Sequence, residues 1–137
     1  MIVVDTNLIA YLFIEGAQSA QAEKVLEKDP EWAAPLLWAS EFRSVLVKCV
    51  RSGLVERADA FRIMAEAESL MSGGEYAVVS AQVLEIATAA SCTAYDAEFV
   101  ALARDLGVTL VTLDRAVLDA FPETAVAPSR FLAAPVP

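Results

Sequence analysis

Short apolar runs alternate along this chain with longer stretches in which apolar residues recur every three or four positions. The runs Ile2-Val3-Val4, Tyr76 to Val79 and Thr109 to Thr112 are rich in β-branched residues, as buried parallel strands are. Trp32 to Ala34 and Ala125 to Ala127 are weaker strand candidates. The pattern therefore predicts three clear strands and two weaker ones, separated by helical segments.

Helical periodicity fills the intervals between these strands. Pro35 is expected to open one helix, and Gly53 and Gly107 follow two others, as is typical at helix ends. Ser80 is a suitable N-cap. The expected helices cover residues 8–14, 19–27, 35–51, 56–71, 80–90, about 95–106, and a short segment from 114 to about 121.

Strands that alternate with helices predict an α/β fold, with a central parallel sheet and helices on both faces. The chain has 137 residues, 57% of them hydrophobic, and no repeat or linker, so a single domain over residues 1–137 is expected. No apolar run approaches the ~20 residues of a membrane span. The first residues show no basic region followed by a long apolar run, so no signal peptide is expected, and Cys49 and Cys92 lack C-x-x-C spacing. These features predict a cytoplasmic protein with reduced thiols and no membrane contact.

Four acidic residues each end or interrupt an apolar stretch. Asp5 and Asp114 follow strands directly, Asp96 lies in the first turn of a helix, and Glu41 lies on an otherwise apolar helix. Taken singly, the first two could be helix N-caps, Asp96 could complement a helix dipole, and Glu41 could be a solvated edge residue. Ligand sites in parallel sheets, however, lie at the carboxyl ends of the strands, where these acids would meet.

Several carboxylates buried near one another are costly unless a cation is bound among them. The chain has no histidine, so the site would offer oxygen ligands, which favour Mg²⁺ or Mn²⁺ over zinc. Such ions can activate water for hydrolysis of a phosphodiester. Thr6, Asn7 and Thr112 could orient the carboxylates, or could serve only as caps and strand-end hydrogen-bonding groups.

The formal net charge of −9 argues against tight nonspecific binding of nucleic acid, but not against catalysis on a phosphodiester. Arg43, Lys48 and Arg51 recur on one expected helix, and Arg115 adjoins Asp114. They are candidate contacts for RNA phosphates, and ordinary solvated charges would look the same.

Two other α/β classes fit the sequence poorly. A phospho-acceptor receiver domain needs a lysine near a late strand, and the only lysines here are Lys24, Lys28 and Lys48. A nucleotide-binding module would carry a G-x-G-x-x-G or P-loop motif, and neither is present.

The order of the four acidic motifs resembles that of the PIN-domain family of metal-dependent ribonucleases. The family's motifs match Val3-Val4-Asp5-Thr6-Asn7, then Ser40-Glu41-Phe42, then Tyr95-Asp96-Ala97-Glu98-Phe99-Val100-Ala101-Leu102-Ala103, and finally Thr112-Leu113-Asp114. The resemblance covers nearly the whole chain. Its size, without appended domains, resembles the VapC-type toxins of prokaryotic toxin–antitoxin pairs.

The resemblance implies a Mg²⁺- or Mn²⁺-dependent endoribonuclease in which Asp5, Glu41, Asp96 and Asp114 hold the metal and carry catalysis. It also implies a homodimer and a cognate antitoxin protein that blocks the acidic site. Two alternatives stay open: a PIN-like module that binds RNA or protein without turnover, and an RNA-processing nuclease unlinked to any antitoxin.

Overall fold

A five-stranded, fully parallel sheet forms the centre of the computed structural model, which describes residues 1–136. The strand order is β3-β2-β1-β4-β5, so the first strand lies in the middle. Val3 pairs with Ala33 on one side and Leu110 on the other. The predicted parallel α/β fold is confirmed. The strands are β1 (Ile2–Val4), β2 (Trp32–Pro35), β3 (Glu75–Tyr76), β4 (Leu110–Val111) and β5 (Ala125–Val126).

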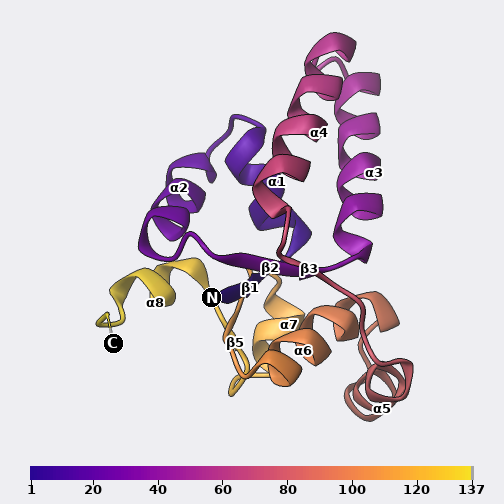
Figure 1. Ribbon diagram of the computed structural model, residues 1–137, viewed down its shortest axis with the longest axis vertical. Helices are drawn as coiled ribbons and strands as arrows, with labels where there is room; N and C mark the ends of the chain where they lie inside the picture. The colour runs from indigo at the N-terminus through magenta and orange to yellow at the C-terminus, as the bar shows by residue number, and fades with distance from the viewer. Residues whose placement is uncertain (137) are drawn as a thin grey trace.

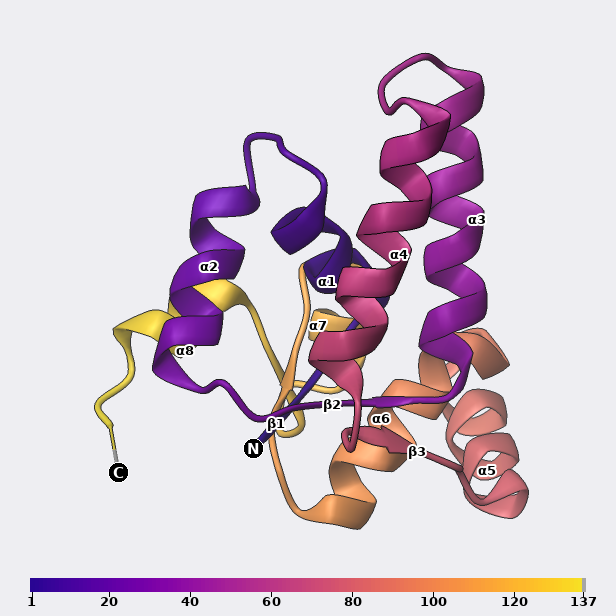
Figure 2. The same ribbon diagram turned by 45° about the horizontal axis from the view of Figure 1, so that its top comes forward.

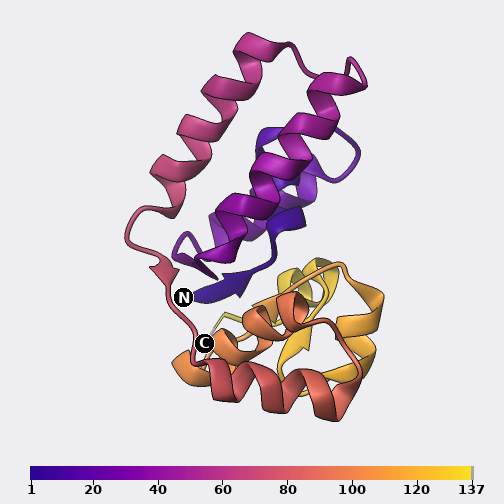
Figure 3. The same cartoon turned by 90° about the vertical axis from the view of Figure 1, so that its right-hand side faces the viewer.

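Helices flank the sheet, with α1 to α4 on one side and α5 and α6 on the other (Figure 3). The helices α3 and α4 form a hairpin that projects away from the sheet (Figures 1 and 2). Within residues 1–136, no helix is long and apolar enough to cross a membrane. The helices are α1 (Thr6–Phe13), α2 (Ser19–Lys28), α3 (Leu37–Arg51), α4 (Arg57–Met71), α5 (Ser80–Ala90), α6 (Ala94–Leu106), α7 (Arg115–Ala120) and α8 (Pro128–Ala133).

The core lies between the sheet and these helices. Val3, Val4 and Val111 are fully buried in the two central strands, as expected for a sheet covered on both faces. On the α1–α4 side, the rings of Trp38 and Phe42 in α3 pack with their centroids 5.8 Å apart. Both side chains are fully buried, so the first two turns of α3, which carry Glu41, are held in the core.

Two expectations about element boundaries were wrong, and one helix was not predicted. Pro35 does not open a helix: it is the last residue of β2 and pairs with Tyr76 of β3, and α3 begins at Leu37. The strand expected over residues 76–79 covers only Glu75–Tyr76, because Val79 has extended backbone and serves as the N-cap residue of α5. Helix α8 was not predicted, although Pro128 at its first position is a typical start signal.

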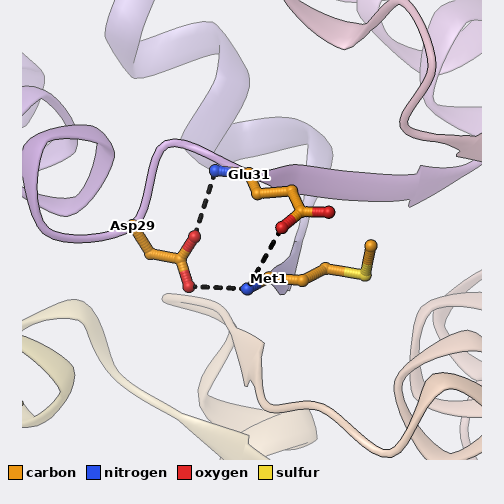
Figure 4. Close-up of polar contacts among 3 residues, drawn as sticks. All are labelled: Met1, Asp29 and Glu31. Atoms are coloured by element: carbon orange, nitrogen blue, oxygen red, sulfur yellow. Dashed lines mark hydrogen bonds and ion pairs between the residues drawn. The ribbon is translucent and has the colours of Figure 1, made fainter. Parts of the chain in front are cut away.

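The start of the chain is held beside the start of β2 (Figure 4). The N-terminal ammonium of Met1 lies 2.9 Å from Oδ2 of Asp29 and 3.8 Å from Oε2 of Glu31. The other carboxylate oxygen of Asp29 accepts the backbone N–H of Glu31 at 3.0 Å. These contacts link the beginnings of β1 and β2, at the end of the sheet opposite Asp5.

Candidate active site

A pocket of about 260 Å³ opens where β1 and β4 end and where α3 and α6 approach them. All four acids singled out in the sequence line it, although they come from four separate parts of the chain. Leu110, Val117, Val45 and Phe99 supply apolar walls. The four carboxylates are those of Asp5, Glu41, Asp96 and Asp114.

Asp5 follows β1 and caps α1. Its Oδ1 accepts the backbone N–H of Leu8 at 2.8 Å, which satisfies one of the free amides of the first helical turn. Its Oδ2 accepts a hydrogen bond from the hydroxyl of Thr112. Because Thr112 follows β4, this bond joins the carboxyl ends of two adjacent strands.

Asp114 caps α7 in the same way. Its Oδ1 accepts the N–H of Val117 at 3.1 Å, and its own backbone N–H donates to Oγ1 of Thr112 at 3.0 Å. The Thr112 hydroxyl therefore donates to Asp5 and accepts from Asp114 at once. This single buried side chain fixes the relative positions of the two acids.

Glu41 reaches the pocket from α3. The hydroxyl of Thr6, itself buried, donates to Oε1 of Glu41 at 2.7 Å. Asp96 reaches it from the first turn of α6, and its backbone N–H donates to Oγ1 of the N-cap Thr93 at 3.0 Å. Each acidic residue is thus positioned by the start of a helix or by a hydrogen bond from a threonine hydroxyl.

Comparison with known proteins identifies the fold. The PIN domain family model matches residues 2–124. The chain belongs to the PIN-domain family.

Individual relatives agree with this assignment. Ribonuclease VapC3 of Pyrobaculum aerophilum is 33% identical over 124 residues, which cover 88% of this chain and 95% of the relative. The crystal structure of PAE2754 from Pyrobaculum aerophilum superposes with a TM-score of 0.76 at 26% identity, covering 96% of this chain and 92% of that one.

Two structures with lower sequence identity resemble this chain in fold, and the likeness supports no statement beyond the fold. A toxin–antitoxin complex from Klebsiella pneumoniae has a TM-score of 0.68 at 18% identity and covers 93% of this chain and 98% of that one. FitAcB from Neisseria gonorrhoeae has a TM-score of 0.68 at 17% identity and covers 94% and 99%, respectively.

The acids of this PIN-domain pocket repel one another. Burial raises the pKa of Asp5 from 3.8 to about 6, and the charge of Asp114 adds to this rise, while the Thr112 hydrogen bond opposes it. Burial and the charge of Asp114 also raise the pKa of Asp96. A bound cation would relieve this repulsion between neighbouring carboxylates.

The donor set fits a hard divalent cation, because carboxylate and hydroxyl oxygens are the groups that such ions prefer. In the part of the chain that the structure describes, no three Asp, Glu, Cys or His side chains are gathered closely enough to ligate one ion directly. Mg²⁺ usually keeps several waters and takes one or two carboxylates directly, so a wider ring of acids suits it.

The other predicted residues lie in three places: the acidic pocket, a second groove and the exposed start of α7. Thr6, Asn7, Thr112 and Lys48 line the acidic pocket. Arg43 and Arg51 instead line an apolar groove between α3 and α4, about 400 Å³ in volume, together with Leu46, Val47, Val50, Arg57, Ala60, Phe61 and Met64. Arg115 is exposed at the first position of α7.

Two residues that lie near the acids were not among the site residues predicted from the sequence. Ser44 lines the pocket one turn after Glu41, a position that helical spacing could have indicated. Glu98 of α6 is half-buried. Burial, and then the charge of Glu41, raise its pKa, so a fifth carboxylate stands near the site.

Proposed function

We propose that this PIN-domain chain is a Mg²⁺- or Mn²⁺-dependent endoribonuclease that hydrolyses RNA phosphodiester bonds. The supporting observation is the convergence of Asp5, Glu41, Asp96 and Asp114 on one open pocket at the carboxyl edge of the sheet. The name of the relative that shares 33% of its residues, Ribonuclease VapC3, supports the same activity.

A divalent ion bound in the pocket would lower the pKa of an attacking water and neutralise charge that develops on the phosphate. Asp5 and Asp96 are the proposed direct ligands. Thr112 holds one Asp5 oxygen in place, so this carboxylate is oriented before the ion arrives. Glu41, oriented by Thr6, and Asp114 complete the ligand set through water, and one of them can accept a proton from the attacking water.

We further propose that the nuclease is the toxin of a type II toxin–antitoxin pair, acting in the cytoplasm as a homodimer. One structure with this fold was solved as a toxin–antitoxin complex, which supports an antitoxin partner. Co-expression with the product of a small adjacent gene should relieve growth arrest caused by this chain. Cleavage without growth arrest, or arrest that no such gene product relieves, would favour an RNA-processing nuclease instead.

The test of catalysis is cleavage of total cellular RNA in Mg²⁺ or Mn²⁺. Asp5→Asn preserves a good N-cap but removes one negative ligand. We expect activity to fall by two or more orders of magnitude, because losing one group that stabilises transition-state charge commonly costs about 10²–10³-fold. Asp119→Asn makes the same charge change at an exposed position of α7 and should leave cleavage unchanged.

EDTA should abolish wild-type cleavage. Cleavage that persists in EDTA and in Asp5→Asn would refute the proposed mechanism. RNA binding without cleavage in either metal would instead support the binding-module alternative.

A further inference from the structure

Helix α3 presents two chemically different faces. Glu41, Ser44, Val45 and Lys48 line the acidic pocket, at the i, i+3, i+4 and i+7 spacing of one helical face. At about 100° per residue, these four positions fall within a sector of about 100°. Arg43 lies about 100° beyond the edge of that sector and Arg51 about 20° beyond it, and both line the apolar groove.

Lys48 is the cationic side chain among the residues that line the acidic pocket. Within the described residues 1–136, its ammonium makes no ion pair, and the ion pairs that are present join Met1, Arg62 and Arg104 to other acids. The charge of Lys48 is therefore available to an incoming anion.

The position of Lys48 along α3 separates it from the carboxylates. It lies seven residues after Glu41, about 10 Å farther along the helix axis. Helix α3 runs away from the sheet (Figure 2), whereas Asp5 and Asp114 follow strands of the sheet closely. Lys48 therefore lies farther from the strand ends than Glu41 does. An RNA strand with its reacting phosphate at the acids would have a flanking phosphate beside α3.

The geometry points to a phosphate-binding subsite on α3, in which the Lys48 ammonium, with the Ser44 hydroxyl one turn before it, holds a phosphate of the RNA that flanks the cleaved bond. This inference rests on the proposed ribonuclease function. The subsite offsets the repulsion between an acidic protein and its anionic substrate at the one place where the strand must be positioned. Lys48 is a positioning residue and takes no part in the bond-breaking step.

Steady-state cleavage of a short single-stranded RNA, measured at several salt concentrations, tests the subsite. Lys48→Gln should raise KM by about 2- to 5-fold at low salt, the range expected for one exposed ion pair, with kcat nearly unchanged. The slope of log binding constant against log salt should become shallower by about 0.7, the value for one phosphate contact on a single strand. Lys48→Arg should restore KM.

Lys24→Gln is the matched control, because Lys24 is an exposed lysine on α2 and does not line the pocket. It makes the same change in net charge and should leave KM and the salt slope at wild-type values. Equal effects of Lys24→Gln and Lys48→Gln, or a loss of kcat at constant KM in Lys48→Gln, would overturn the inference.

Fluorescence anisotropy with the same RNA, in an Asp5→Asn background, gives a readout apart from turnover. Lys48→Gln should weaken binding there by a similar factor and with the same change in salt slope. If wild-type protein fails to cleave RNA in either metal, the proposed function fails. In that case the anisotropy measurement alone decides whether Lys48 binds an RNA phosphate.

Discussion

At the scale of single residues, Asp5 and Asp114 each have a structural and a chemical role. One oxygen of each carboxylate caps a helix, as the simplest interpretation of the sequence held. The same side chains also line the pocket. Helix capping therefore fixes the direction of two proposed metal ligands, and the two interpretations of these residues are compatible.

The raised pKa of Asp5 predicts a pH-dependent stability in the metal-free protein. The folded state holds a proton on Asp5 up to about pH 6, whereas the unfolded chain loses it near 3.8. The contribution of Asp5 is therefore fully present below pH 3.8 and is lost as pH rises through 6. The rise from 3.8 to about 6 corresponds to at most about 3 kcal/mol.

Melting temperatures in EDTA between pH 3.5 and 7.5 measure this effect. Relative to Asp5→Asn, the wild-type protein should lose stability between about pH 4 and pH 6 and then level off. A difference between the two proteins that does not change over this range would contradict the raised pKa.

Thr112→Val tests the hydroxyl that joins the two acids. Valine keeps the shape but leaves the N–H of Asp114 without its partner and removes a donor from Asp5. We expect a loss of about 1–3 kcal/mol in stability, and a 10- to 100-fold loss in activity because Asp5 is no longer oriented.

Thr109→Val is the control for that change. The Thr109 side chain makes no hydrogen bond within the described chain, so this variant should melt and cleave nearly as the wild type does. Thermal melting and kcat/KM measure both variants. Equal behaviour of Thr112→Val and Thr109→Val would show that the Thr112 hydroxyl does not organise the site.

At the scale of elements, Gly74 sets how closely β3 approaches β2. A Cβ atom built at Gly74 would lie 2.1 Å from the backbone oxygen of Trp32, and the carbonyl of Gly74 accepts the N–H of Ala34 at 2.9 Å. The strand β2 leads directly into α3, so this contact also bears on the position of Glu41.

Gly74→Ala should therefore destabilise the protein by about 3 kcal/mol or more, because backbone atoms must move to relieve the clash. This corresponds to a fall of roughly 10 °C in melting temperature. Gly16→Ala is the control, since nothing lies within 4 Å of a Cβ at that position. If the two variants melted together, β3 would have to be free to shift away from β2.

The sequence predicted elements best where the chain carried a strong local signal. The β-branched run Ile2–Val4 and the periodic helices were recognisable because burial selects those patterns. Pro35 was misplaced because its end-of-strand role depends on pairing with Tyr76, a contact that the local sequence does not contain. The role of Lys48 on α3 was also not visible in the sequence, because the acids that share its pocket, such as Asp5 and Asp114, come from distant segments.

At the scale of the whole molecule, several large apolar side chains remain outside the core. Phe61 and Leu84 are 64% and 61% exposed, and Leu54, Tyr95, Val79 and Leu36 are also exposed. Exposed apolar surface of this kind commonly marks contacts with other chains. We expect light scattering at micromolar concentration to give twice the chain mass of 14.6 kDa. A mass of one chain would remove the homodimer from the proposed function without affecting the catalytic site.

The position of β1 in the middle of the sheet has a consequence for synthesis on the ribosome. The hydrogen bond between Thr112 and Asp5 spans 107 residues of sequence, and β1 has no second neighbour until β4 has been made. Contacts of such long range form late, after most of the chain is available. A nascent or prematurely terminated chain that stops before residue 110 has Asp5 without Thr112 and Asp114. The proposed nuclease thus has no complete candidate site until its translation is nearly finished.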